Sequence, residues 1–237
     1  MISHEHQCIF VHVPRCGGTS IEKAIWGRHQ TEEHLRHGFN SRYENKYQTG
    51  GLQHLLAWQI RAETGEPVFN DYFKFTVVRN PWDKLVSQYH FMAKREDLRE
   101  FIGMNADDDF TAYLELIQKK LHVQWEHQHK FIFDENGKSM VDFVGRYEQY
   151  DRVAAWLLNR LGIRRGKLKH RNKSQRRPHQ EYYSDDSREC VAQMYAKDIE
   201  LFQYTFDGYG PAPCVQDNLP RTGIGRYLAR FTRSSRS

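Results

Sequence analysis

The 237-residue chain lacks several features that would place it in common classes of protein. No run of about 18 apolar residues exists, so no segment suits a transmembrane helix. A buried strand is predicted from Cys8 onward, which leaves no room for a signal peptide before it. The four cysteines, Cys8, Cys16, Cys190 and Cys214, have no CxxC spacing, which predicts free thiols in a reducing compartment. These absences favour a cytoplasmic protein without a membrane anchor.

Internal repeats and low-complexity linkers are also missing, which indicates one domain. With 39% hydrophobic and 14% aromatic residues, the chain can bury a sizeable core. The net charge of +5 is distributed unevenly, because the last twenty residues hold five arginines and no acid. We therefore expect a catalytic body over residues 1–209 and a basic tail over residues 210–237.

The first candidate site is a predicted strand followed by a glycine-bearing loop and a helix. Residues 8–13 (CIFVHV) suit a buried parallel strand, and Pro14 ends it. Two glycines then let the backbone fold tightly, so that N–H groups and the positive end of the next helix face one spot. An ordinary turn that binds nothing is the alternative. The pattern favours an anion site made by Arg15, Cys16, Gly17, Gly18, Thr19 and Ser20.

This loop differs from that of a nucleoside triphosphatase. A Walker loop, GxxxxGK[ST], needs a lysine that reaches the outer phosphates and a hydroxyl that binds magnesium. Here Gly17 is followed by Gly-Thr-Ser without a lysine. The second predicted strand, residues 73–78 (FKFTVV), ends in Arg79 where a magnesium-binding Asp is expected. An arginine at this position repels a metal ion and attracts a second anion.

The second candidate site begins at Arg79, in the segment RNPWDKLVS. Asn80 suits the cap of a helix, Pro81 its first turn and Asp83 its positive end. Ser87 lies about two turns further along, on a face that can look back toward Arg79. A purely structural pair between Arg79 and Asp83 is the alternative. Two anion sites at the ends of two parallel strands predict a ligand with two separated anionic groups.

With these two motifs, the chain resembles the sulfotransferases that use 3′-phosphoadenosine 5′-phosphosulfate (PAPS), of the carbohydrate (family 2) type. PRCGGTS at residues 14–20 resembles the family's 5′-phosphosulfate loop, and VVRNPWDKLVS at residues 77–87 resembles its 3′-phosphate motif. The similarity continues through HLLAWQI, DFVGRYEQYD and NKSQRRPHQEYYSDD to about Tyr209. It implies a P-loop-like α/β fold of three layers, in which helices flank a central parallel sheet. It also implies transfer of a sulfuryl group from PAPS to a carbohydrate hydroxyl.

The resemblance assigns roles to residues beyond the two motifs. Lys173 and Ser174 are implied to lie in a loop that closes over the nucleotide, with Arg177 as a weaker candidate. The family more often has lysine where Arg15 stands. Because an arginine does not readily release a proton, Arg15 is expected to act in catalysis through its charge. Transfer in line needs no metal in principle, so none is expected.

The acceptor hydroxyl needs a base, and thirteen histidines are available. A histidine in the block before the 3′-phosphate strand serves as the base in related enzymes, which implies His54, with His12 and His37 next. Apolar neighbours along a predicted helix direct His54 toward a less buried side. Some histidine pairs have metal-like spacing without a consistent four-ligand set: His4/His6, His34/His37 and His127/His129.

Hydrophobic periodicity predicts strands at residues 8–13, 73–78 and 140–144, with a weaker one at 131–133. The predicted helices cover residues 20–27, 52–63, 81–93, 110–121, 149–161 and 185–202. Strands that alternate with helices imply a parallel sheet covered on both faces.

The expected partners are PAPS and a carbohydrate or polysaccharide. Residues 160–177 hold nine Lys or Arg and no acid, yet no nucleic-acid-binding motif flanks them, so no nucleic acid is expected. The tail has apolar residues at helical spacing among arginines, a pattern that allows weak peripheral contact with an anionic membrane. Alternatives are a nucleotide kinase or NTPase, and a non-catalytic polyanion-binding module. Three aromatic residues are candidates for the acceptor cleft: Tyr43, Trp58 and Trp125.

Overall fold

The computed structural model describes residues 1–27, 35, 43, 52–163 and 176–211. In these residues the sheet has four strands, in the spatial order β1 (Ile2–Ser3), β2 (Cys8–Val11), β3 (Phe73–Val78) and β4 (Phe143–Arg146). β3 pairs parallel with β2 and β4, and β1 pairs antiparallel with β2 at one edge. The strands β2 and β4 are buried along their whole length, as continuous apolar runs predict for a covered parallel sheet.

Helices cover both faces of this sheet, and further helices form a separate cluster at one end of it. The longer helices are α1 (Gly18–Trp26), α2 (Ala57–Thr64), α3 (Glu66–Asp71), α4 (Pro81–Met92), α5 (Glu96–Ile102), α6 (Phe110–Gln118), α7 (Gln128–Ile132), α8 (Tyr150–Arg160), α9 (Asp185–Met194) and α10 (Ala196–Phe202). Short 3₁₀ turns are η3 (Leu52–His54), η4 (Val123–Trp125), η5 (Tyr147–Gln149) and η6 (His179–Tyr182).

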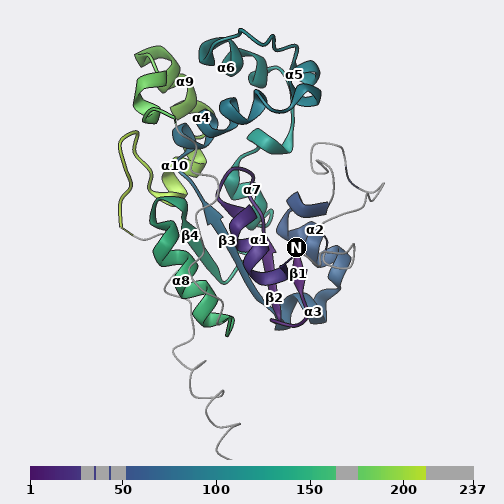
Figure 1. The fold of residues 1–237 in the computed structure, drawn as a ribbon. Helices are drawn as coiled ribbons and strands as arrows, with labels where there is room; N and C mark the ends of the chain where they lie inside the picture. Colours follow the sequence, from purple (N-terminus) through teal and green to yellow (C-terminus); the bar gives the residue numbers. More distant parts are fainter. Residues whose placement is uncertain (28–34, 36–42, 44–51, 164–175, 212–237) are drawn as a thin grey trace, which may run out of the picture.

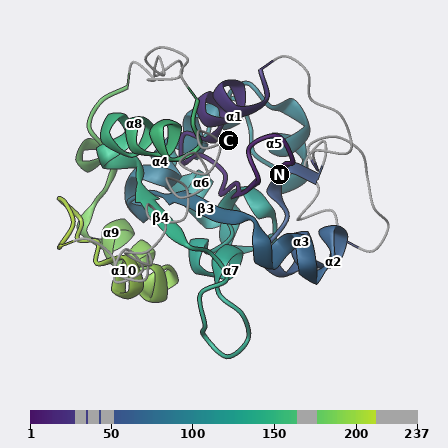
Figure 2. The same cartoon turned by 90° about the horizontal axis from the view of Figure 1, so that it is seen from below.

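The arrangement has the predicted three layers. Figure 2 shows α1 and α8 on one side of the strands, and α7 and α10 on the other. A three-layer α/β fold with a mostly parallel sheet is thereby confirmed, with the antiparallel β1 as an unpredicted addition.

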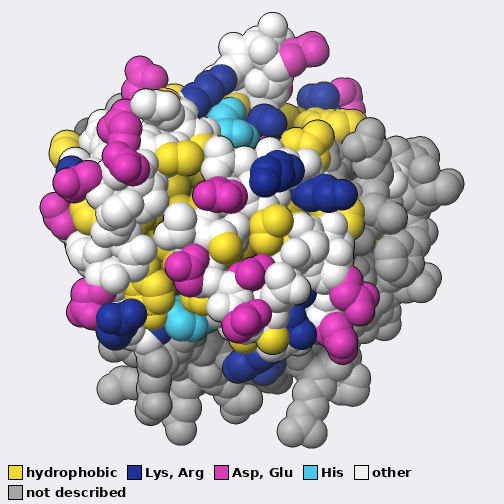
Figure 3. Space-filling model, turned by 90° about the horizontal axis from the view of Figure 1, so that it is seen from above, with side chains coloured by type: hydrophobic (Ala, Val, Ile, Leu, Met, Phe, Trp, Pro, Cys, Tyr) yellow, Lys and Arg dark blue, Asp and Glu magenta, His cyan; other side chains and the backbone are white. Residues whose placement is uncertain are grey.

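Two hydrophobic clusters hold the layers together. The larger one surrounds the sheet, where Phe10, Phe75 and Phe143 occupy paired positions on three neighbouring strands. The smaller one joins α4, α5, α6 and α9, which we call the helical cap. The cap lies at the top of Figure 1, above the sheet. Seen from above, the described part of this end mixes basic, acidic and hydrophobic side chains, and neither sign of charge covers it alone (Figure 3).

Several predicted elements have different bounds, for identifiable reasons. The predicted strand 131–133 is wrong, because these residues lie at the end of α7 and just after it. The strand predicted at 140–144 is shifted to Phe143–Arg146, although Met140 and Val141 are buried as expected. The predicted helix 52–63 is interrupted at Leu56, whose extended backbone separates η3 from α2. The predicted helix 185–202 likewise divides at Tyr195 into α9 and α10.

No helix in the described ranges is both long and apolar enough to cross a bilayer. Three of the four cysteines, Cys8, Cys16 and Cys190, are free thiols as expected, and Cys214 lies outside the described residues.

Candidate functional site

A pocket of about 230 Å³ opens where the parallel strands end. Its walls come from residues 12–22 after β2, from residues 79–91 after β3, and from Tyr147 and Tyr150 after β4. In open α/β sheets, ligands bind outside the carboxyl ends of the strands, and the pocket is at this edge. It contains or borders both predicted anion sites.

The first loop has the backbone geometry of an anion cradle. Arg15 has a φ of 65° and Gly17 a φ of 84°, both in the left-handed region. Gly18 begins α1, and a Cβ added there would lie only 2.0 Å from Nε2 of His12. The N-terminal turn of α1, with Thr19 and Ser20, therefore borders the pocket at a point where only glycine fits.

Arg15 is held in the pocket without an acidic partner in the described part of the chain. Its Nε and Nη2 donate to the hydroxyl of Ser87 at 3.3 and 3.1 Å, and its guanidinium lies 4.4 Å from the centre of the Phe91 ring. Ser87 thus contacts Arg15 of the first loop, whereas the sequence predicted that it would face Arg79. Burial, and then the neighbouring Arg79 cation, lower the pKa of Arg15 to about 10. A bound anion would relieve this cost.

Arg79 lines the same pocket but already has an acidic partner. Its Nε and Nη2 bind one oxygen of Asp83 at 2.7 and 2.6 Å, and its Nη1 donates to the carbonyl of Arg15 at 2.9 Å. Arg176 binds the other carboxylate oxygen of Asp83. Burial alone favours the neutral guanidine, yet the Asp83 carboxylate outweighs it and raises the pKa of Arg79. The structural pair between Arg79 and Asp83 is therefore present, while Arg79 still faces the pocket.

Gln128, a residue that the sequence did not single out, joins the two loops. Its side-chain oxygen accepts the backbone N–H of Arg79 at 2.8 Å, and its nitrogen donates to the Arg79 carbonyl at 2.7 Å. The same oxygen accepts a hydrogen bond from the Cys16 thiol at 3.4 Å. Burial raises the pKa of Cys16 to about 12, which keeps this thiol protonated and able to donate. Gln128 therefore fixes the end of β3 against the first loop.

His54 lies in the pocket wall, although it is only 4% exposed. The prediction of a less buried side is wrong, because the break at Leu56 turns η3 toward the end of β2. Nδ1 of His54 lies 3.0 Å from the carbonyl oxygen of His12, which can only accept, so Nδ1 carries the proton. Nε2 is left as the acceptor, 3.4 Å from the amide nitrogen of Gln53. Burial, and then His12, lower the pKa of His54 to about 3.

Other predicted residues are placed away from the pocket or outside the described residues. Three of them lie outside the described residues: Lys173, Ser174 and His37. Arg177 is exposed and lies 3.4 Å from Glu181. None of the three candidate aromatic residues is in the described wall of this pocket. Trp125 packs in the cluster of the helical cap, Trp58 is 46% exposed, and the hydroxyl of Tyr43 donates to Glu63.

The aromatic residues that do line the pocket are Phe91, Tyr147 and Tyr150. Two of them directly follow β4, so the rule that ligands bind at strand ends could have found them. Tyr150 donates to the carbonyl of Gly17 at 3.3 Å, and Tyr147 lies against the guanidinium of Arg79 at 3.9 Å. They place aromatic surface beside each anion site.

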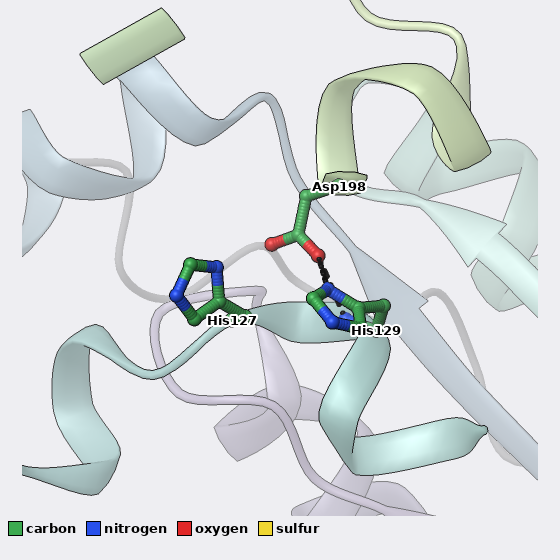
Figure 4. Close-up of side chains that lie close together, drawn as sticks. All are labelled: His127, His129 and Asp198. Atoms are coloured by element: carbon green, nitrogen blue, oxygen red, sulfur yellow. Dashed lines mark hydrogen bonds and ion pairs between the residues drawn. The ribbon is translucent and has the colours of Figure 1, made fainter. Parts of the chain in front are cut away.

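A group that could hold a metal ion occurs elsewhere, at the start of α7. His127, His129 and Asp198 bring one ligand atom each within 4.8 Å of one another (Figure 4). Asp198 is fully buried, and it accepts the backbone N–H groups of Gln128 and His129. It also pairs with Nδ1 of His129 at 2.6 Å. These contacts explain the group as a clamp that joins α10 to α7.

Comparison with known proteins agrees with the geometry of the pocket. The model of the sulfotransferase family matches residues 1–205. An uncharacterized protein of Archaeoglobus fulgidus is 31% identical over 118 residues, which cover 46% of this chain and 83% of that protein. The comparison with solved structures gives no significant match. The match to the family model extends over both predicted anion sites and all four described strands, and the chain belongs to the sulfotransferase family.

Proposed function

We propose that this sulfotransferase transfers a sulfuryl group from PAPS to a hydroxyl of a carbohydrate or glycan acceptor. The observation that carries the proposal is Arg15, a half-buried cation with no carboxylate partner in the described residues. It lines the same pocket as the start of α1 and the second cation, Arg79, which donates to the Arg15 carbonyl. Two cations at the ends of neighbouring strands suit a donor whose two anionic groups are separated by a nucleoside.

The residues of the two motifs divide the donor between them. Backbone N–H groups from Cys16 to Ser20 and the charge of Arg15 would hold the 5′-phosphosulfate, at the positive end of α1. Arg79 and Ser87 are proposed to contact the 3′-phosphate. Lys173 and Ser174 are proposed, from the resemblance alone, to cover the nucleotide. No metal ion is needed in this scheme.

His54 is proposed as the base that receives the proton of the acceptor hydroxyl. Its Nδ1–H is directed to the carbonyl of His12, so the lone pair lies on Nε2, where the acceptor hydroxyl would replace the amide of Gln53. The low pKa of His54 keeps this imidazole neutral at pH 7, the form that can accept a proton. Negative charge on a bound donor would raise its basicity when the complex forms.

The experiment that tests the proposal follows a radiolabelled sulfuryl group from PAPS into a panel of polysaccharides and lipid-linked glycans. We expect labelled product with at least one glycan, and calorimetric binding of adenosine 3′,5′-bisphosphate. Stronger stabilisation by ADP with magnesium than by the bisphosphate would instead favour a nucleotide kinase or NTPase. Binding of heparin-like polymers without any response to nucleotide would favour a polyanion-binding module, although the mixed charges in Figure 3 do not support one on that face.

The basic tail is proposed to make at most weak contact with anionic membranes, at about 1 kcal/mol per basic residue near the surface. Residues 212–237 lie outside the described part of the chain. Sedimentation with anionic vesicles at low and high salt, for the whole chain and for a chain shortened before Leu219, tests the contact. Absence of vesicle binding by the whole chain at low salt would reject it.

A further inference from the structure

Glu22 and His12 form a second titratable pair in the pocket. Oε1 of Glu22, on α1, lies 2.7 Å from Nδ1 of His12, which follows β2. Glu22 is 2% exposed and His12 is 7% exposed, and both line the pocket. A buried carboxylate is costly unless it is paired, and the His12 imidazole is one close partner of Glu22.

His12 also touches the loop that is proposed to hold the phosphosulfate. Its Nε2 is the ring atom nearest to the position of a Cβ on Gly18, at 2.0 Å, so the ring packs directly on the first residue of α1. Phe10 stacks on the ring, with the centres 5.1 Å apart, and holds its plane. Because Nδ1 faces Glu22, Nε2 is the nitrogen that remains for a ligand in the pocket.

The two pocket histidines have opposite environments. Their ring centres are only 4.6 Å apart, so a charge on one opposes a charge on the other. His12 has a carboxylate at 2.7 Å, whereas His54 is buried with no such contact to the described residues, and its pKa is lowered to about 3. Neighbouring groups with contrasting environments divide the acid and base roles between them.

Resting on the proposed function, we propose that His12, oriented by Glu22, is a further catalytic residue that acts on the donor. Nε2–H of the imidazole, whose other nitrogen faces the Glu22 carboxylate, donates a hydrogen bond to the oxygen that bridges phosphorus and sulfur. Arg15 supplies charge there but does not readily release a proton, and its N–H groups already contact Ser87. Glu22 is a positioning residue, because its carboxylate lies against Nδ1 and holds the ring.

The reaction step then has a defined place for each atom and electron pair. The acceptor oxygen forms the new bond to sulfur, and its proton passes to Nε2 of His54. The bond between sulfur and the bridging oxygen breaks, and its electron pair remains on the 5′-phosphate. The His12 hydrogen bond stabilises the negative charge that develops on this oxygen. The products are a sulfate ester and adenosine 3′,5′-bisphosphate.

The test compares His12→Asn and Glu22→Gln with the whole wild-type chain. Asparagine can keep a donor near the Nδ1 position for Glu22 while it removes Nε2, and glutamine removes only the charge of Glu22. His129→Asn is the matched control, because His129 lies equally close to a carboxylate, that of Asp198, but outside the pocket (Figure 4). The assays measure conversion of PAPS to the bisphosphate, with a glycan or water as the acceptor, and calorimetric binding of PAPS and of the bisphosphate.

We expect His12→Asn to lower kcat by about 10²–10³, the scale of a lost transition-state donor, with every acceptor. Glu22→Gln should lower kcat about tenfold or more, while both variants bind PAPS within about twofold of wild type, because the bridging oxygen carries little charge until sulfur departs. The bisphosphate carries that charge, so its affinity should fall in His12→Asn. His129→Asn should leave kcat unchanged. Wild-type kcat in His12→Asn, or equal losses of kcat and PAPS affinity, would overturn the role of His12. A wild-type chain that neither binds the bisphosphate nor cleaves PAPS would refute the proposed function itself.

Discussion

Arg15→Ala should separate the stability of the free protein from its affinity for the donor nucleotide. Arg15 is an unneutralised cation beside a second cation, Arg79, and no carboxylate in the described residues offsets the repulsion. Removing it relieves an unfavourable charge in the free protein. The same substitution deletes a charge that the phosphosulfate would contact, so the two properties should respond differently.

The magnitudes follow from the contacts of Arg15. Displacement of its pKa from 12.5 to about 10 corresponds to about 3 kcal/mol of cost to the charged form, and less after solvent screening of a half-buried group. The substitution also removes the hydrogen bonds of Arg15 to Ser87 and its contact with Phe91, which together stabilise the folded protein by about 2–3 kcal/mol. Because these terms nearly cancel, the free energy of unfolding should stay within about 1 kcal/mol of wild type.

Affinity for PAPS should fall about ten- to a hundredfold, since a charge-assisted contact contributes roughly 1.5–3 kcal/mol. Urea unfolding measures the free energy of unfolding, and calorimetry measures the affinity for PAPS. Arg79→Ala is the comparison, because it removes the buried cation that pairs with half-buried Asp83 and should cost about 3 kcal/mol of stability. It should also weaken binding of the bisphosphate far more than binding of a nucleotide without the 3′-phosphate. An Arg15→Ala protein that is as unstable as Arg79→Ala, or that binds PAPS normally, would refute this reasoning.

Three further predictions concern the pocket and its histidines. His54→Ala should lower turnover about a hundredfold or more with nearly unchanged nucleotide affinity, and full activity would reject His54 as the base. Gly18→Ala should weaken nucleotide binding and lower the melting temperature, because its Cβ would overlap His12, and unchanged values for both would contradict the packing. Burial lowers the pKa of His54 to about 3 and of His122 to about 4, from 6.5. The unfolded chain therefore binds protons that the folded chain excludes, so the free energy of unfolding should fall as the pH drops from about 6.5 toward 4, and replacing both histidines with Asn should flatten that slope in urea titrations.

Much of the fold followed from local patterns in the sequence. The strand at residues 73–78 has the predicted bounds, and Asn80 caps α4 by accepting the backbone N–H of Trp82, as its position suggested. The glycine loop after β2 and Arg79 after β3 meet in one pocket because parallel strands end at the same edge. The strand, the cap and each loop depend on residues that are close together in the chain, and the meeting of the two loops follows from the parallel pairing of β2 with β3.

The remaining features depend on contacts between distant segments. Periodicity could not reveal that the backbone of Leu56 is extended, which turns His54 inward to the carbonyl of His12, 42 residues away. Residues 131–133 have the apolar character of a strand, yet α7 forms there because buried Asp198 accepts the N–H groups at its start. The contact of Arg15 with Ser87 likewise required the tertiary structure, whereas the pair between Arg79 and Asp83 spans one helical turn and was an alternative that the sequence offered.

The side chain of Gln128 has the hydrogen-bonding pattern of a peptide group. It accepts from the N–H and donates to the C=O of a single residue, Arg79, as a neighbouring strand would do at the end of β3. The Gln128 side chain thus supplies, just beyond the end of β3, the two hydrogen bonds that a backbone would otherwise supply. Glutamate would have no donor for this exchange, and methionine would leave both backbone groups of Arg79 unpaired. The direction in which the chain leaves β3, and with it the placement of Arg79, is therefore encoded by one amide 49 residues further along the sequence.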